Sequence, residues 1–223
     1  QEIDTFTQEF RWTSDLDGNF NYVAGVYFLQ EDTDRTEQFR LLLPRDTTGA
    51  TFVDPATQTW GSAVDIGNEV SRQENETTSY AAYFQGDYDV NDALTLTFGL
   101  RYTYDEKETT STSVNCGNDA GQAGYPEYCT GVGGSLSIIP QTFRVTADDS
   151  WSDVSPKFTA TYNTSEDVMW YGTVSWGCKS GGFGGAPGTP EGASTPVDPE
   201  EVVNYEIGMK GDFLHRTLRF HAA

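Results

Sequence analysis

Positive charge is scarce in this chain, and so are the residues that build most metal sites. The 13 Lys and Arg residues are outnumbered by 34 Asp and Glu residues, which gives a formal net charge of -21. A nucleic-acid partner needs a basic surface, so the composition excludes nucleic acid and disfavours docking on anionic lipid. His215 and His221 have no Cys or His at ligand spacing, so we expect no metal site and no cofactor.

Long hydrophobic runs are also missing. No segment approaches the roughly 18 consecutive apolar residues of a membrane-spanning helix, and the start of the chain does not resemble a signal peptide. Neither a G-x-S-x-G elbow nor a phosphate loop occurs, so we expect no enzyme. A membrane is still open to the chain, because a barrel strand crosses in about 9 to 11 residues with only every second one apolar.

Strict alternation of apolar and polar residues is what the sequence does contain. In residues 93–103 one face of an extended strand carries Leu94, Leu96, Phe98, Leu100 and Tyr102, and the other carries Thr95, Thr97, Gly99, Arg101 and Thr103. The same period recurs in residues 5–13, 20–30, 80–88, 157–162, 168–177, 203–213 and 217–223. These segments predict an all-β protein of about eight antiparallel strands.

The connections between these strands alternate in length. Short polar turns at 14–19, 91–92, 163–167 and 214–216 are separated by long irregular stretches at 31–78, 105–153 and 179–200. All short turns would then lie at one end of the sheet and all long loops at the other. That asymmetry is typical of bacterial outer-membrane β-barrels, with short periplasmic turns and long extracellular loops. An amphipathic sheet in a soluble protein remains the alternative.

The register suggests part of a wider barrel. The first strand descends toward the periplasm, whereas a complete barrel normally starts there, and the alternation is still running at Ala223. Eight strands cut from a wide sheet have two unpaired edges, which are costly in hydrocarbon. We therefore expect residues 1–223 alone not to form a functional receptor.

Four segments together resemble the barrel domain of TonB-dependent outer-membrane receptors. They are TQEFRWTSDLDGNFNYVAGVYF, SYAAYFQGDYDVNDALTLTFGLRYTYDEK, MWYGTVSWGCKSGGF and PEEVVNYEIGMKGDFLHRTLRFHAA, in the family's order. The resemblance implies a twenty-two-stranded barrel that surrounds an N-terminal plug and imports ferric siderophores, haem, cobalamin or glycans. Trp176 and Cys178 depart from the family, in which a basic residue and an aromatic are more common before KSGGF, and this leaves the substrate type open.

The resemblance also implies a domain assignment, partners and a location. Residues 1–223 would be a partial barrel domain, without the plug, the TonB box and the last strands. The full receptor would lie in the bacterial outer membrane and contact its lipid. It would reach the TonB complex through the missing plug region and take up a bulky nutrient, of which an iron chelate is the leading choice. Two other functions stay open: a passive porin-like channel and a soluble β-sandwich that binds glycans.

Three groups of residues are candidate sites. Cys116 and Cys129 fall in one predicted extracellular loop, where an oxidising environment favours a disulfide. Charged residues predicted to face the lumen are candidates for contact with the plug or the ligand, or for ordinary solvated wall: Arg101, Glu206, Lys210 and Arg219. The loop motif KSGGF could be a ligand-contacting hinge, but its glycines more simply let a strand leave the sheet; its candidates are Lys179, Gly181, Gly182 and Phe183.

Overall fold

Eight antiparallel strands form one continuous sheet in the order β1-β2-β3-β4-β5-β6-β9-β10. The computed structural model describes residues 1–44, 63–115, 142–185, 187–215 and 217–223. The strands of this sheet are β1 Glu2–Thr13, β2 Phe20–Pro44, β3 Ala63–Asn91, β4 Leu94–Asn115, β5 Phe143–Ser165, β6 Val168–Lys179, β9 Glu200–Phe213 and β10 Leu218–Ala222. Between β6 and β9 lie the short strands β7 Gly182–Phe183 and β8 Pro196–Val197, and the helix α1 Pro190–Ser194. The predicted all-β antiparallel fold is confirmed.

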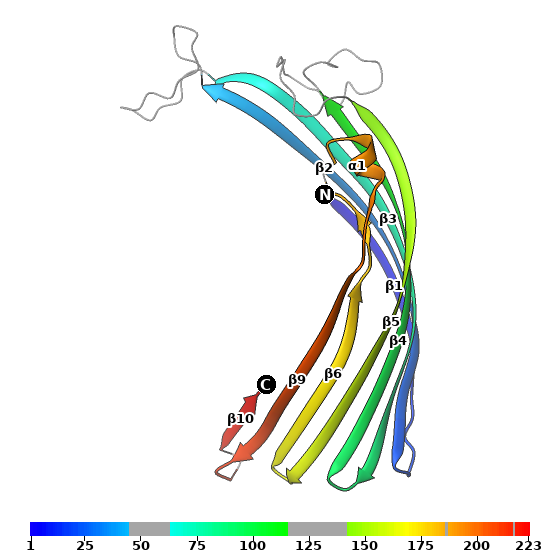
Figure 1. Ribbon diagram of the computed structural model, residues 1–223, viewed down its shortest axis with the longest axis vertical. Helices are drawn as coiled ribbons and strands as arrows, with labels where there is room; N and C mark the ends of the chain where they lie inside the picture. Colours follow the sequence, from blue (N-terminus) through cyan, green and yellow to red (C-terminus); the bar gives the residue numbers. More distant parts are fainter. Residues whose placement is uncertain (45–62, 116–141, 186, 216) are drawn as a thin grey trace, which may run out of the picture.

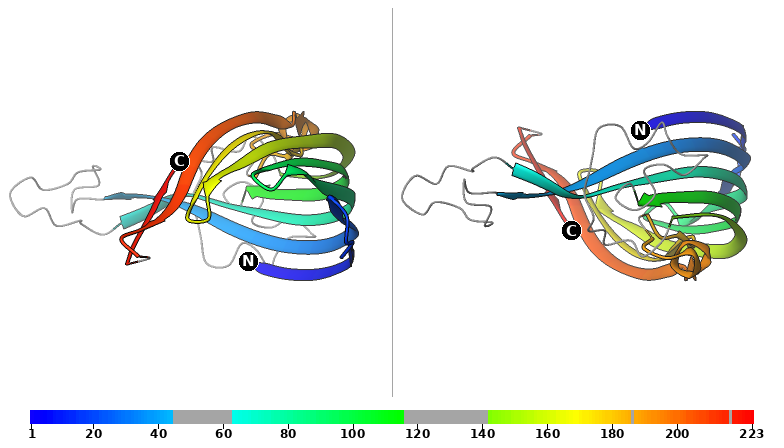
Figure 2. Two further views of the ribbon diagram at one scale, coloured as in Figure 1. Left: turned by 90° about the horizontal axis from the view of Figure 1, so that it is seen from below. Right: turned by 90° about the horizontal axis from the view of Figure 1, so that it is seen from above.

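The sheet is strongly curved and open. Seen along the strands, β1 to β10 follow one another around an arc whose two edges do not meet (Figure 2). The segment that carries α1 folds back onto the concave side of the sheet (Figure 1). No helix among the described residues is both long and apolar enough to cross a membrane.

The register places whole rows of like residues side by side across the strands. One row joins Gly86, Phe98, Phe158, Val174 and Tyr205 on five consecutive strands of the sheet. The next row along the strands is polar: Gln85, Gly99, Lys157, Ser175 and Asn204. Because successive side chains point to opposite faces, the sheet has an apolar convex face and a polar concave face.

The apolar face is exposed rather than packed. Phe98 is 40% exposed, Phe158 50% and Tyr205 76%, and aromatic side chains on β1 are exposed by about the same fraction. Soluble monomers rarely expose a continuous apolar surface of this extent, whereas a barrel wall requires one against lipid. The convex face therefore has the character of a lipid-facing surface.

Many of the most buried side chains lie on β3 and β4 beyond the apolar band, and many of them are polar. Among the described residues Thr109, Ser111 and Ser113 are each 1% exposed, and the buried hydrophobic residues nearby are Val70, Val114 and Phe143. Phe143 forms a small cluster with Ala193 of α1 and with Val145. The loop between β6 and β9 thus supplies part of the cover for the concave face.

The described residues of two predicted long loops, at 31–78 and 105–153, are almost all strand, so these loop boundaries were wrong. Strands β2 and β3 stay paired up to Pro44 and Ala63, and β4 and β5 up to Ser113 and Phe143. Above the apolar band a strand does not need an apolar face. Neighbouring strands there form polar cross-strand pairs, such as Thr110 with Thr146, whose hydroxyl oxygens lie 2.8 Å apart. The short turns lie where they were predicted, although β5 continues to Ser165 in the turn expected at 163–167. In the turn after β3 the Asn91 side chain accepts from the backbone N–H of Ala93 and Leu94.

Candidate functional site

The concave face carries a tyrosine that lies flat over a glycine of the neighbouring strand. Tyr83 on β3 pairs with Gly25 on β2, and a Cβ atom added to Gly25 would lie 2.5 Å from the tyrosine ring. The Tyr83 hydroxyl donates to Glu9 Oε1 at 2.5 Å. Arg101, two strands from β2, lies 5.7 Å from the centre of the Tyr27 ring. Glycine is needed here because only a missing side chain leaves room for the ring.

The same arrangement recurs on the concave face of β6 and β9. Tyr171 on β6 pairs with Gly208 on β9, and a Cβ atom added to Gly208 would again lie 2.5 Å from the ring. The Tyr171 hydroxyl donates to Glu206 Oε1 at 2.6 Å, and Lys210 Nζ lies 5.7 Å from the ring centre. Beyond them Arg219 on β10 donates to Asp212 Oδ1 at 2.7 Å. The structure thus engages these residues in contacts within the wall. Glu206 and Lys210 both contact Tyr171, and Lys210 and Arg219 line one pocket, whereas Arg101 lies on β4.

Above these residues a glycine-rich segment crosses the concave face. We call residues 181–185 the strap. Lys107 Nζ on β4 donates to the Gly181 carbonyl oxygen at 2.6 Å, and Gln73 Nε2 on β3 donates to the Gly184 carbonyl oxygen at 2.5 Å. The Phe183 ring lies 6.2 Å from the Trp151 ring, edge to face.

The glycines of the strap allow its main chain to approach the wall closely. A Cβ atom at Gly181 would overlap the Trp151 indole and the Val197 carbonyl oxygen, and one at Gly185 would lie 3.3 Å from Arg35 Nη1. The simpler interpretation of KSGGF, a strand leaving the sheet without a clash, does not include this packing. Lys179 precedes the strap, and its Nζ is 3.4 Å from Glu200 Oε1 at the exposed surface.

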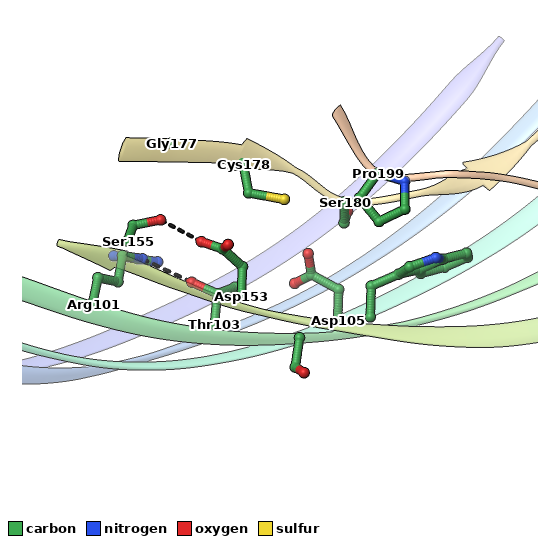
Figure 3. Close-up of a pocket in the computed structure, with 11 residues that line it drawn as sticks. Arg101, Thr103, Asp105, Asp153, Ser155, Gly177, Cys178, Ser180 and Pro199 are labelled. Atoms are coloured by element: carbon green, nitrogen blue, oxygen red, sulfur yellow. Dashed lines mark hydrogen bonds between the residues drawn. The ribbon is translucent and has the colours of Figure 1, made fainter. Parts of the chain in front are cut away.

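A pocket of about 160 Å³ lies between the wall and the end of β6. Its floor carries Arg101, Asp105 and Asp153 from β4 and β5, and its rim includes Cys178 and Ser180 (Figure 3). Arg101 Nε donates to Thr103 Oγ1 at 3.0 Å, and Ser155 donates to Asp153. Cys178 is a free cysteine. Among the described residues no group of three or more His, Cys, Asp or Glu side chains could hold a metal ion.

Lys107, which donates to the strap, has a shifted pKa. Partial burial of Lys107 lowers the pKa of its ammonium group, and the nearby Asp105 carboxylate opposes that change. The Lys107 ammonium also lies 5.5 Å from the centre of the Trp151 ring. A charged donor, an aromatic face and a main-chain acceptor therefore meet at one point of the strap.

An ion-pair network lies on the convex side of the long strands. Arg72 Nη2 lies 2.5 Å from Asp34 Oδ2 and 3.1 Å from Glu74 Oε1, and Arg144 Nη2 lies 3.4 Å from Glu74 Oε2. The hydrogen bond from Arg72 is the main cause that lowers the pKa of the Asp34 carboxyl. This network connects β2, β3 and β5 above the apolar band.

Several of these residues were missed by sequence reasoning. Gln73, Lys107 and Trp151 fall in stretches taken for irregular loop. A strand signal that could have placed Lys107 is the enrichment in Thr of residues 109–112. Cys116 and Cys129 lie outside the described residues, so their disulfide stays a prediction.

Comparison with known proteins bears on the whole chain. The family described as TonB-dependent receptor-like β-barrel matches residues 1–223. No curated protein sequence matches at a significant level.

Solved structures resemble the chain in fold. The ferric yersiniabactin uptake receptor FyuA from Yersinia pestis is 18% identical with a TM-score of 0.63, over 95% of this chain and 26% of its own. The siderophore receptor PiuA from Acinetobacter baumannii is 16% identical with a TM-score of 0.59, over 98% and 30%. The ferric-catecholate import receptor Fiu from E. coli K12, in its open form, is 16% identical with a TM-score of 0.53, over 96% and 28%. This chain thus spans less than a third of the length of each of them.

Proposed function

This chain belongs to the TonB-dependent receptor family through its β-barrel domain, and on that basis we propose that it forms part of the wall of an outer-membrane receptor for energy-coupled uptake of a bulky nutrient. The family is one of transport receptors rather than enzymes. The nutrient we propose is a ferric siderophore. The wall would face bacterial outer-membrane lipid on its convex side and the transport path on its concave side.

The observation that carries this proposal is the separation of the two faces over the length of the lower strands. The convex face exposes Phe98, Phe158 and Tyr205, as a surface against lipid must. On the concave face, polar side chains instead form hydrogen bonds with one another, as Tyr83 does with Glu9 and Tyr171 with Glu206. A polar inner wall suits a lumen filled by water, a plug or a ligand.

The choice of an iron chelate rests on the neighbours rather than on the site. The solved structures compared above are siderophore or ferric-catecholate receptors by name, and at 16 to 18% identity they are similar to this chain in fold alone. Under this proposal residues 1–223 are part of a barrel domain, and coupling to the TonB complex passes through a plug that belongs to the full receptor.

Uptake by cells that carry the complete gene tests the proposal. We expect cells with the gene to take up radioactive iron from a set of ferric chelates, and a deletion strain to lose this uptake for at least one chelate. An uncoupler that dissipates the proton-motive force should abolish the same uptake. Uptake that persists with the uncoupler would instead favour a passive porin-like channel.

A further inference from the structure

The strap occupies hydrogen-bond donors that face the transport path. Arg35 and Gln73 are directly opposite each other on β2 and β3. Lys107 lies on β4 four residues along the strand from Ser111, the partner of Gln73. Gln73 and Lys107 each donate to a strap carbonyl oxygen, at 2.5 and 2.6 Å, and Arg35 Nη1 lies beside Gly185. Donors from three neighbouring strands therefore converge on one stretch of main chain, which offers them only neutral acceptors.

We propose that Arg35, Gln73 and Lys107 form a binding site for an oxygen-rich anionic ligand, and that the strap fills this site in the ligand's absence. The inference rests on the proposed function, because it requires a ligand to enter the concave face. It goes further in naming the charge class of that ligand and the element of the chain that competes with it.

The chemistry of the donors selects the class of ligand. An ammonium, a guanidinium and an amide N–H all donate, and a hydrogen bond with an ionised donor or acceptor is roughly twice as strong as one between neutral groups. An anionic oxygen would therefore strengthen the bond of Gln73 and would form ion pairs with Lys107 and Arg35, which a neutral carbonyl cannot do. A ligand that presents several carboxylate or phenolate oxygens would therefore outcompete the carbonyls of Gly181 and Gly184. Arg35 is also paired with Glu37 through its Nη2 atom, which leaves Nη1 on the side of Gly185.

A cationic ligand is the alternative to an anionic one. Asp105 and Asp153 line the pocket just below the strap (Figure 3), and a cationic ligand could bind these carboxylates. The two classes predict different effects of moving the strap. Freed donors would strengthen the binding of an anionic chelate and leave the binding of a cationic one unchanged.

The strap is held by contacts that a single methyl group can break. A Cβ atom at Gly181 would overlap the Trp151 indole, so Gly181→Ala should displace the strap. Gly188 lies in the same connection with nothing within 4 Å of an added Cβ atom, which makes Gly188→Ala the matched control. Trp151 reports the position of the strap through its fluorescence, isolated by subtracting the signal of a Trp151→Phe counterpart of each variant.

The test uses the purified full-length receptor in detergent with two probes, iron(III) citrate and the cationic iron(III) complex of desferrioxamine B. Because the apparent affinity of a site is reduced by the fraction of time it is blocked, we expect Gly181→Ala to bind iron(III) citrate about tenfold more tightly. Gly188→Ala should bind as the wild type does. Adding Lys107→Met to Gly181→Ala should remove most of the gain, since Met keeps an unbranched aliphatic side chain and deletes the charge.

Three results would overturn the inference. The first is a changed Trp151 signal in Gly181→Ala with no gain for iron(III) citrate, and the second is a gain for the cationic complex. The third is an unchanged Trp151 signal in both Gly181→Ala and the bulkier Gly181→Val, which would mean that these contacts do not hold the strap. In each case energy-dependent uptake of any ferric chelate by cells would leave the proposed function standing, so the two failures are distinguishable.

Discussion

Replacing Phe98 by Arg should cost far more stability than the same replacement one residue earlier. Phe98 lies four residues above Leu94, which is about 13 Å along the strand and, at a barrel tilt of about 40°, about 10 Å along the barrel axis. The apolar band of such barrels is about 25 Å tall, so this side chain lies near its middle. An Arg at that depth costs about 2 to 4 kcal/mol on the lipid face.

The neighbouring contacts set the two controls. Phe98→Ala deletes the ring that lies 5.1 Å from the Phe158 ring, a contact worth about 0.5 to 1.5 kcal/mol, without adding a charge. Thr97→Arg faces the concave side, where the Thr97 hydroxyl now donates to Asp87 at 2.5 Å. An Arg there exchanges that hydrogen bond for a pair with the same carboxylate, so the net change should stay within about 1 kcal/mol.

Reversible unfolding of the full-length receptor in lipid vesicles, titrated with guanidinium chloride, measures these differences. We expect Phe98→Arg to be about 2 to 4 kcal/mol less stable than Thr97→Arg, with Phe98→Ala between them. Equal penalties at the two positions would refute the assignment of the faces. A larger penalty at Thr97 would reverse it.

Three further predictions follow from particular contacts. Gly208→Val should destabilise the receptor by about 1 to 3 kcal/mol, because the new side chain meets the Tyr171 ring. Gly172→Val should cost little, since nothing lies within 4 Å of a Cβ atom added there. The temperature at which the heat-modifiable band is lost in gels measures both changes, and equal shifts would contradict the prediction. Arg72 lowers the pKa of Asp34, so the ion pair stabilises the folded strands fully above the ordinary carboxyl pKa near 4, and this stabilisation should fade as the pH falls below it. Amide hydrogen exchange at Asp34 and Glu74, corrected for intrinsic rates, should show this small effect. Arg72→Gln should abolish it. Cys116 and Cys129 should be recovered as one bridged peptide after digestion without reductant, and alkylation of both thiols in the untreated receptor would refute the disulfide.

The sequence was most informative where lipid constrains the chain. Within the band, a side chain facing hydrocarbon must be apolar and its neighbour need not be, so the alternation from Leu94 to Tyr102 predicted both the strand and its two faces. The short turns followed from the same logic. This is why the fold class could be predicted without a structure.

The constraint disappears above the band, and prediction failed there. Residues 105–115 do not alternate between apolar and polar side chains. Polar cross-strand pairs, such as Thr109 with Asn75 at 2.7 Å, connect this part of β4 to β3. The strap was harder still to foresee. Its contacts join Gly181 to Lys107 across 74 residues and Gly184 to Gln73 across 111, and no local pattern encodes a contact at that separation. The glycines of KSGGF were interpreted as letting a strand leave the sheet, whereas Gly181 also packs closely against Trp151.

Site-directed spin labelling along β4 tests the central claim most directly. Labels placed one at a time from Thr95 to Thr103 in the full-length receptor in vesicles would be probed with oxygen, which partitions into lipid, and with a water-soluble nickel complex. A two-faced wall predicts oxygen access that peaks at Leu96, Phe98, Leu100 and Tyr102 and nickel access that peaks at the residues between them. Access without a two-residue period, or with the opposite phase, would contradict it.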